Sequence, residues 1–414
     1  METLIRGEEV IKVNGRSYRL DTPPVVAVCL DGTDPSYLEA CVDVMPNLAK
    51  MMQGGAQGIA NSAIPSFTNP NNVAIATGVP AKVNGISGNF YYDAESGAEV
   101  MMNSPEYLRC GTLFAAMAQA GRSVAVVTAK DKLRSILGYG LDGICFSVEK
   151  AQDVIHTDPR LAMVAALRGG TSPGIYDPEA SIYCLEAGAA MLEAGVADLL
   201  YLSTTDYVQH KAAPDEELAH AFYKRVDEML GRLHATGAIV AVTADHGMNA
   251  KTCADGTPRV RFLETLLNEA GFEGAFVILP ITDPYVLHHG ALGSYATVYL
   301  PNGGIEDARA MLAAVSGVEQ VLSRDEAAKQ FLLPEDRIGD LVVLGDHVTT
   351  FGRTPEWHDL SGVHQGLRSH GGLHERSVPF VINRPLLPEY AERLASGFVN
   401  NYDIYDFALN GTQR

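Results

Sequence analysis

Long apolar runs, secretory features and positive charge are scarce in this sequence, and each scarcity excludes a class of protein. No stretch of 18 or more uninterrupted apolar residues occurs, so we expect no transmembrane helix and no membrane partner. The opening METLIRGEEVIKVNG is too charged for a signal peptide. Lys and Arg number 31 against 50 Asp and Glu, a formal net charge of −19. Because nucleic-acid backbones need a basic surface, this balance argues against a nucleic-acid partner.

Cysteine is sparse as well, with 6 copies in 414 residues and no CxxC pair. The six are Cys29, Cys41, Cys110, Cys145, Cys184 and Cys253. Several of them lie in apolar runs. This scatter favours reduced, mostly buried thiols in a cytoplasmic protein.

The chain is long enough, and with 47% hydrophobic residues apolar enough, for more than one compact unit. Two alternating runs joined by Asn14-Gly15 predict a β-hairpin. Short apolar runs then alternate with helical patterns, which predicts an α/β fold with a mostly parallel sheet between helices. These strand-like runs cover residues 25–31, 123–129, 198–206 and 238–245.

Residues 253–362 carry a fresh set of strand and helix patterns, after which the chain returns to a strand-like segment at 378–383. We therefore predict a core built from residues 1–252 and 363–414, with residues 253–362 inserted as a small α/β cap domain.

Three of the strand-like runs end in aspartate: Asp31, Asp206 and Asp245. A single aspartate in this position more often caps a turn. In open parallel sheets, however, ligands bind at the carboxyl ends of the strands. Three carboxylates meeting there would repel one another unless a cation lay between them. The pattern therefore predicts a metal site, and bound metal ions would let this acidic chain accept an anionic substrate.

Histidines complete the predicted metal site. His210 follows Asp206 by four residues, His246 directly follows Asp245, and the segment RSHGGLHE supplies His370 and His374. Carboxylate with neutral imidazole favours Zn²⁺ over Mg²⁺ or Ca²⁺, with Mn²⁺ and Fe²⁺ as competitors. Other histidines are expected to be structural or superficial: His156, His220, His234, His288, His289 and His364.

Thr68 and Asn89 are the candidates for chemistry beside the metals. Thr68 precedes the helix-like VAIATG, so it lies near a helix N-terminus, where the backbone dipole favours an anion. A threonine there is commonly an N-cap, but coordination to a divalent ion would make it a nucleophile. Asn89, in GISGNFYYD, is either part of a Gly-Asn turn or an amide donor to a phosphoryl oxygen.

Taken in order, six motifs resemble the alkaline phosphatase superfamily, most closely its nucleotide pyrophosphatase/phosphodiesterase-like branch. They are LDG at 30–32, PSFTNPNN at 65–72, GNFYYD at 88–93, DYVQH at 206–210, ADHGM at 244–248 and SHGG at 369–372. The resemblance implies an alkaline-phosphatase-like core and two Zn²⁺ ions. It assigns one ion to Asp206, His210 and His370, with His374 as the alternative to His370, and the other to Asp31, Thr68, Asp245 and His246.

Within this superfamily the sequence is most similar to the members that hydrolyse phosphonoacetate. Two of only ten lysines, Lys130 and Lys132, follow the run at 123–129, where a solvated charged turn is the simpler explanation. In those relatives two such lysines bind the substrate, and the resemblance carries this role to Lys130 and Lys132. Breaking a carbon–phosphorus bond expels a carbanion, and the lysines would stabilise it as charge moves onto the substrate carboxylate.

The implied reaction converts phosphonoacetate to acetate and phosphate through a phosphothreonine at Thr68. The expected substrate contacts are Thr68, Asn89, Lys130, Lys132 and His210, with Arg368 and Tyr91 as further candidates. The alternatives are a nucleotide pyrophosphatase or phosphodiesterase, which would need an apolar slot for a base, and a non-catalytic metal-binding relative. A phosphomutase-like or sulfatase activity is a third, and no CxPxR stretch supports the sulfatase. The sequence leaves the oligomeric state open, and a homodimer is compatible with it.

Overall fold

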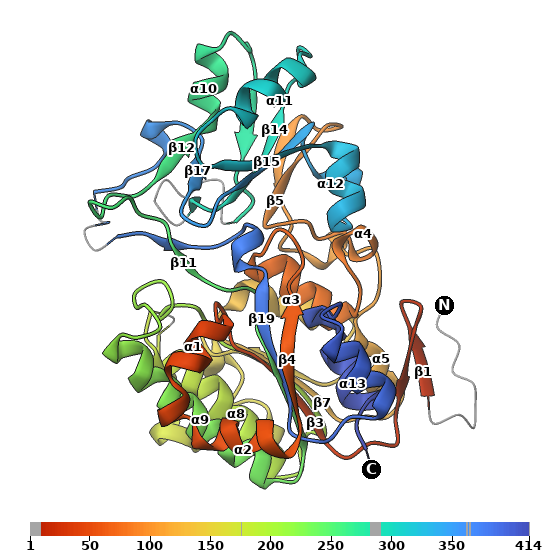
Figure 1. Cartoon of the computed structure of the whole chain (residues 1–414). Helices are drawn as coiled ribbons and strands as arrows, with labels where there is room; N and C mark the ends of the chain where they lie inside the picture. The colour runs from red at the N-terminus through yellow and green to blue at the C-terminus, as the bar shows by residue number, and fades with distance from the viewer. Residues whose placement is uncertain (1–9, 175, 282–290, 362, 364–365, 414) are drawn as a thin grey trace.

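The structure, a computed structural model, describes residues 10–174, 176–281, 291–361, 363 and 366–413. Within these residues, seven strands form a central sheet in the lower half of Figure 1. Their order is β4 (Ala56–Asn61), β19 (Ser377–Ile382), β10 (Ile239–Thr243), β3 (Val25–Cys29), β9 (Leu199–Ser203), β7 (Val124–Thr128) and β8 (Ile144–Ser147). Six of these strands run in the same direction, and β19 runs opposite to them. The predicted α/β class and mostly parallel sheet are confirmed.

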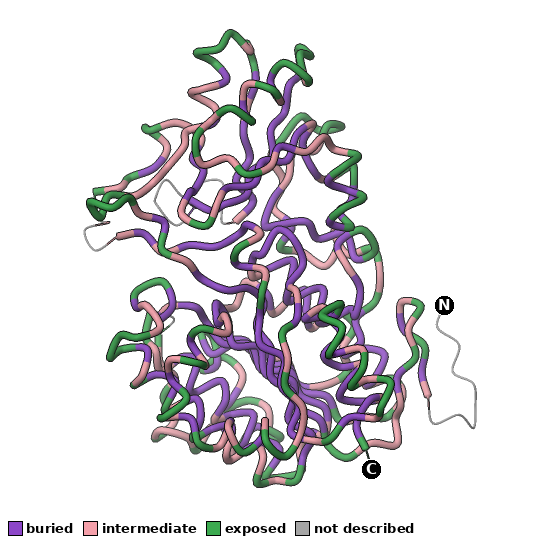
Figure 2. The backbone as a smooth tube through the Cα atoms, in the orientation of Figure 1, coloured by how far each residue is buried: buried purple, intermediate pink, exposed green. Residues whose placement is uncertain are grey.

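Helices cover both faces of this sheet, because alternate strand residues point to opposite sides. Leu200 and Leu202 of β9 belong to one apolar cluster, whereas Leu199 and Tyr201 belong to the other. The first face packs against α1 (Pro35–Ala40), α2 (Pro46–Gly54), α7 (Ala162–Ala165), α8 (Glu179–Glu193) and α9 (Glu217–Ala235). The second packs against α3 (Thr68–Thr77), α5 (Leu113–Gln119), α6 (Arg134–Leu137), α13 (Pro388–Ala395) and α14 (Ile404–Asn410). Figure 2 shows the inner strands as a buried layer, whereas the edge strand β4 is partly exposed.

A second, antiparallel sheet lies in the upper half of Figure 1, in the order β13 (Phe276–Ile278), β14 (Tyr295–Tyr299), β16 (Leu341–Gly345) and β15 (Val318–Ser323). One face packs against α10 (Leu263–Glu269) and α11 (Ile305–Ala313), the other against α12 (Arg324–Phe331). These elements fall within the predicted cap domain. The proposed limits of that domain, 253 and 362, stay a prediction.

The two sheets are joined by a shared apolar cluster. Ile64 and Phe67, just before α3, pack with Tyr295 of β14 and Phe331 of α12. A hairpin of β5 (Phe90–Asp93) and β6 (Ala98–Met101) adds a smaller contact with the upper sheet. The end of α3 that carries Thr68 is therefore held between the two sheets.

Small elements complete the fold. The predicted hairpin is confirmed as β1 (Val10–Val13) and β2 (Arg16–Arg19), with Asn14 and Gly15 both at positive φ as a type I′ turn requires. The others are α4 (Ala81–Asn84), the β11–β18 pair (Asn249–Ala250, Arg368–Ser369) and the β12–β17 pair (Val260–Phe262, Thr350–Gly352).

Three further expectations from the sequence concern the cysteines, the remaining histidines and membrane-spanning helices. The six cysteines, all of them described residues, form no disulfide, but Cys110 and Cys145 are only half-buried and Cys253 is exposed, so burial is less general than predicted. His288, His289 and His364 lie outside the described residues. In the described part of the chain, no helix has both the length and the apolar character that a membrane crossing requires.

Candidate active site

Four adjacent parallel strands deliver the charged residues to one edge of the central sheet. β10, β3 and β9 lie side by side in register, and β7 follows β9. Just beyond the ends of these strands lie Asp245, Asp31, Asp206 and Lys130, in that spatial order. The predicted convergence of the three strand-end carboxylates is thus confirmed.

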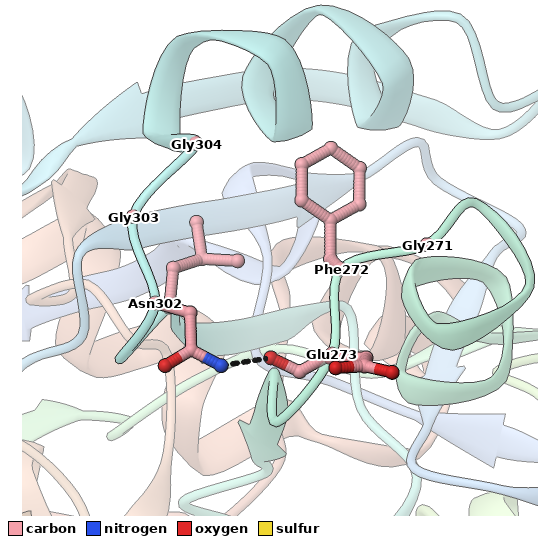
Figure 3. A pocket seen from close by; sticks show the side chains of 7 residues that line it. Gly271, Phe272, Glu273, Asn302, Gly303 and Gly304 are labelled. Carbon is pink, nitrogen blue, oxygen red and sulfur yellow. Dashed lines mark hydrogen bonds between the residues drawn. The ribbon is translucent and has the colours of Figure 1, made fainter.

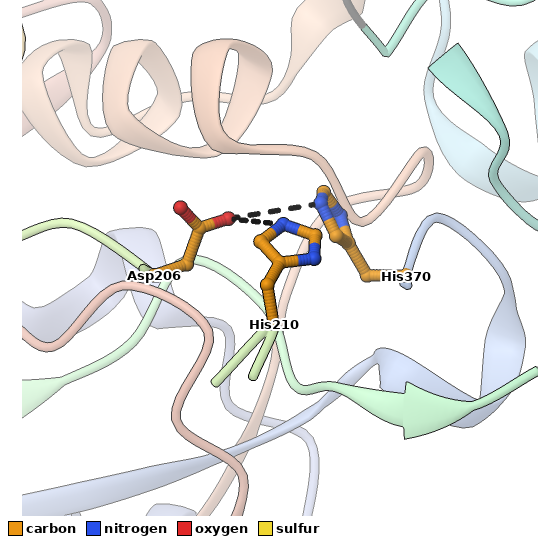
Figure 4. A group of neighbouring side chains, drawn as sticks. All are labelled: Asp206, His210 and His370. Carbon is orange, nitrogen blue, oxygen red and sulfur yellow. Dashed lines mark ion pairs between the residues drawn. The ribbon is translucent and has the colours of Figure 1, made fainter. Parts of the chain in front are cut away.

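The ligand candidates form two groups, and within each the donor atoms lie within 4.8 Å of one another. In the first, Asp206 Oδ2 is 3.0 Å from His210 Nε2 and 4.0 Å from His370 Nε2 (Figure 4). The second contains Asp31, Asp245 and His246, with His246 Nε2 3.3 Å from Asp31 Oδ1. Two carboxylate–imidazole groups side by side fit a pair of divalent cations.

All three histidines are held in one tautomer by backbone carbonyls. His246 Nδ1 donates to Gly247 O at 2.8 Å, and His370 Nδ1 to Ser66 O at 2.8 Å. His210 Nδ1 donates to Arg368 O at 2.9 Å. In the neutral form of each ring, Nε2 is therefore the unprotonated nitrogen and faces the carboxylates, as a metal-ligating histidine requires.

Asp31 has an oxygen that suits a cation. The Oδ2 atom is buried and accepts no hydrogen bond from the described residues, and it forms an ion pair with Lys130 Nζ at 3.7 Å. A buried carboxylate oxygen without a donor is costly unless a cation compensates it. This atom is the clearest local indication that the second group can hold a metal.

Thr68 is the first residue of α3, and the structure brings it to the second group. Its Oγ1 lies 3.2 Å from His246 Nε2 and 3.5 Å from Asp31 Oδ1. The helix begins earlier than the sequence pattern predicts, since Pro70 is tolerated in a first turn. The hydroxyl therefore sits at a helix N-terminus beside two candidate ligands, where the backbone dipole favours negative charge.

Asn89 is held close to the start of α3. The amide of Asn69 donates to Gly88 O at 3.2 Å and to Met102 O at 3.3 Å, and the backbone N–H of Met102 donates to Asn89 O at 2.7 Å. The Asn89 amide nitrogen itself donates to Ile281 O. One of its two N–H groups is thus committed to Ile281, and the described residues provide no hydrogen-bond acceptor for the other.

Lys130 reaches into the carboxylates, with its Nζ 2.7 Å from Asp206 Oδ1 and its side chain 36% exposed. Lys132 is half-buried in the following 3-10 turn (Asp131–Leu133). Between them, Asp131 accepts hydrogen bonds from Arg134, Ser147 and Lys150. The donor–acceptor distances are 2.7, 2.8 and 2.8 Å. These bonds fix the backbone from which both lysines project.

The pKa values of the buried groups respond to this crowding. Burial, together with the charge of Asp31, raises the pKa of Asp245 to about 7. Burial lowers the pKa of His246, but Asp245 and Asp31 outweigh it and raise that pKa to about 9. Burial raises the pKa of Asp206, yet Lys130 and His210 hold it well below its usual range. The edge thus gathers negative charge that only nearby cations make tolerable.

Three further sequence candidates contribute no side chain to either group. His374 is exposed and bonded to Glu319 at 2.6 Å, so His370, and not His374, joins the first group. The Arg368 guanidinium donates to Gln209 O at 2.8 Å and to the Tyr37 hydroxyl at 2.9 Å. Tyr91 packs under the guanidinium of Arg337. The donors of Arg368 thus serve the fold.

A hollow of about 360 Å³ lies in the upper half of the structure, between the α10–β13 turn and the start of α11 (Figure 3). It is lined by Phe272, Glu273, Leu300, Asn302 and the glycines 271, 303 and 304. Glu273 and the acidic first turn of α11, Glu306 and Asp307, disfavour an anion there. We therefore place the active site at the two ligand groups and not at this hollow.

Sequence reasoning missed the role of the asparagines after Thr68. Asn69, Asn71 and Asn72 are all buried on α3. Asparagine is a poor helix former, and a buried amide must be hydrogen-bonded. Three asparagines in four positions before an apolar helix were the available signal that this turn anchors neighbouring segments.

Comparison with known proteins identifies the family of this chain. The family of Type I phosphodiesterase / nucleotide pyrophosphatase matches residues 25–373. Two crystal structures of phosphonoacetate hydrolase from Sinorhizobium meliloti 1021, with phosphonoformate and with phosphonoacetate, are 47% identical at a TM-score of 0.90. Each match covers 97% of this chain and 98% of that one.

More distant matches support the fold. Murine ectonucleotide pyrophosphatase / phosphodiesterase 5 is 17% identical, covers 93% of both chains and has a TM-score of 0.61. The bovine (Bos taurus) ectonucleotide pyrophosphatase/phosphodiesterase family member 3 is 31% identical over 87 residues, which is 21% of this chain but only 10% of that protein. The family resemblance predicted from the motifs is confirmed.

Proposed function

Because this chain belongs to the type I phosphodiesterase/nucleotide pyrophosphatase family, we propose that it hydrolyses the carbon–phosphorus bond of phosphonoacetate, giving acetate and phosphate. The observation that carries the proposal is the position of Thr68 Oγ1, within 3.5 Å of both His246 and Asp31. Support also comes from the 47% identical relatives, whose structures contain phosphonoacetate and phosphonoformate.

Two zinc ions are the cofactors that the donor set fits best. The first group, Asp206, His210 and His370, would hold one ion, and Asp31, Thr68, Asp245 and His246 would hold the other. When bound, the ions would favour the alkoxide of Thr68 and withdraw charge from the phosphonate oxygens. The buried Asp31 Oδ2 and the three oriented Nε2 atoms support this assignment.

Thr68 is the proposed nucleophile. Its oxygen attacks phosphorus, and the carbon–phosphorus bond breaks with its electron pair remaining on the substrate carbon. The free N–H of Asn89 stabilises the charge gathering on the phosphoryl oxygens. Water then attacks the phosphothreonine, which releases phosphate and restores the Thr68 hydroxyl.

Lysines are needed here because negative charge develops on the leaving group. The carbanion of acetate is delocalised onto the substrate carboxylate and is then protonated from solvent. Lys130, together with Lys132 two residues later, would bind that carboxylate more strongly as its negative charge grows. This binding would stabilise the transition state more than the bound substrate and so lower the activation barrier. The leaving group of a phosphodiester would not require the two lysines in this way.

The nucleophile is tested by Thr68→Ala with Thr68→Ser as its matched control. We expect Thr68→Ala to lose turnover of phosphonoacetate while its metal content stays at or near that of the wild type, and Thr68→Ser to retain measurable activity. Undiminished turnover by Thr68→Ala would exclude the covalent step.

The substrate is tested by comparing kcat/KM for phosphonoacetate with that for a nitrophenyl phosphodiester. Lys130→Met and Lys132→Met should each lower kcat/KM for phosphonoacetate far more than for the diester. Lys224→Met is the control, because it removes an exposed lysine of α9 and leaves the Asp131 bonds intact. A wild-type preference for the diester would instead favour a phosphodiesterase.

A further inference from the structure

Asn72 lies one helical turn after Thr68, on the same face of α3, and is completely buried. Its Nδ2 donates to Asp245 Oδ2 at 3.0 Å and to Thr68 O at 2.9 Å. One amide group thus contacts both the residue proposed as nucleophile and a candidate metal ligand. The other oxygen of Asp245, Oδ1, accepts from the backbone of Gly32 and His246.

Two hydroxyl groups of β9 fix the orientation of this amide. Tyr201 and Ser203 are two residues apart and so point to the same face of the sheet, toward α3. Each donates to Asn72 Oδ1 at 2.7 Å. A flipped amide would set its oxygen against the Asp245 carboxylate and the Thr68 carbonyl, which are both acceptors. Only the observed orientation satisfies all four contacts.

We propose that Asn72 is a positioning residue that holds Asp245 in the geometry for metal binding, with Tyr201 and Ser203 locking its amide. This inference rests on the proposed function, because it assumes that Asp245 holds an ion. The three residues form a relay from β9 through α3 to the end of β10. Partners of this kind, one contact removed from the metal, typically contribute about 10- to 100-fold to metal affinity.

The relay predicts a selective effect on one ion. Asn72 contacts Asp245 of the second group, and no hydrogen bond among the described residues joins it to Asp206, His210 or His370. Its loss should therefore weaken the second site and leave the first unchanged. A general loosening of the fold would weaken both sites.

The test is Asn72→Leu, which keeps the shape of the side chain and removes its hydrogen bonds. Zinc affinity is measured by competition with a chromophoric chelator, and Co²⁺ absorption spectra report the coordination of each ion. A His370→Ala background isolates the second site. We expect about 10- to 100-fold weaker zinc binding there and an altered Co²⁺ spectrum.

Thr77→Val is the matched control. Thr77 is also buried on α3 and bonds the carbonyl of Val73 at 2.8 Å, so its loss costs stability without touching Asp245. The double variant Tyr201→Phe/Ser203→Ala keeps Asn72 but frees its amide, and should reproduce part of the effect even if Asn72→Leu folds poorly.

Unchanged zinc affinity in Asn72→Leu, or equal losses at both sites, would overturn the relay. So would an equal loss in Thr77→Val. A wild-type chain that takes up no zinc would overturn the proposed metal site itself, and this inference with it. A wild-type chain that binds zinc normally while Asn72→Leu is unaffected would leave the proposed function intact.

Discussion

His246 and His370 lie face to face, with their ring planes 5° apart and their centroids 3.6 Å apart. One imidazole belongs to each ligand group, so the two groups are in contact through this pair of stacked rings. Burial lowers the pKa of His370 well below its usual range, and the neighbouring His246 and His210 lower it further. His370 is thus kept neutral, the form in which imidazole binds metal.

His370→Ala should therefore reduce the metal content from two ions to one per chain. The control is His374→Ala, which removes an exposed histidine bonded to Glu319 and should leave both ions in place. Metal analysis after gel filtration distinguishes the two variants. Loss of an ion in His374→Ala, and not in His370→Ala, would reverse the assignment.

Lys251 and Glu375 form a fully buried ion pair, 2.7 Å apart with both side chains 0% exposed. Lys251 Nζ also donates to His347 O, and Glu375 accepts from Gly372 N in the His370 loop. Glu375→Gln should destabilise the protein by about 3–5 kcal/mol, because it leaves a buried ammonium without its counter-charge. The shift of the urea midpoint measures this cost.

Replacing both partners of this pair should cost less than the sum of the single changes, since Lys251→Met/Glu375→Leu leaves no buried charge. Arg232 and Glu193, 36% and 45% exposed, provide the surface control. Breaking that pair should cost less than about 1 kcal/mol. Similar costs at the two pairs would contradict the argument.

Phe67 connects the proposed nucleophile with the first ligand group. Its ring is edge-on to both Tyr295 and His370, at 5.8 Å in each case. Phe67→Ala should cost about 3–5 kcal/mol through the cavity it leaves, and should also weaken zinc binding by loosening His370.

The control for this change is Phe407→Ala on α14. Phe407 is equally buried but packs on Phe380 and Tyr390. Its loss should cost similar stability and leave zinc affinity unchanged, as measured by chelator competition. Weaker zinc binding in both variants would show that stability, not position, is responsible.

Asp131 should make stability depend on pH in acid. Burial raises the pKa of Asp131, but hydrogen bonds from Arg134, Lys150 and Ser147 lower it to about 2. A carboxyl group with a lowered folded-state pKa stabilises the protein above its unfolded pKa, near 4, and this contribution is lost as pH falls toward 2.

Asp131→Asn should therefore be less stable at neutral pH and should lose less stability than the wild type between pH 4 and pH 2. Urea unfolding across this range measures both slopes. Asp215→Asn is the control, because it removes an exposed carboxylate and should leave the slope of the wild type unchanged. Parallel slopes for the wild type and Asp131→Asn would contradict the assigned bonds.

Much of the fold, and the meeting of the three aspartates at one edge of the sheet, could be predicted from the sequence. Period-two and all-apolar runs identified the strands, because these patterns depend on a residue's immediate neighbours. Asp31, Asp206 and Asp245 could be placed together because parallel strands share the edge at which they end. The turn at Asn14-Gly15 was equally local.

Only the tertiary structure decided which distant groups meet. His370 reaches Ser66 O, and Asn72 reaches Asp245, across 304 and 173 positions of sequence. No local pattern records such contacts, because they depend on how β9, β10 and α3 cross in space. The sequence by itself determined that an acidic, histidine-bearing edge exists. The packing determined that His370, and not His374, lies at this edge, and that the Asn72 amide donates to Asp245.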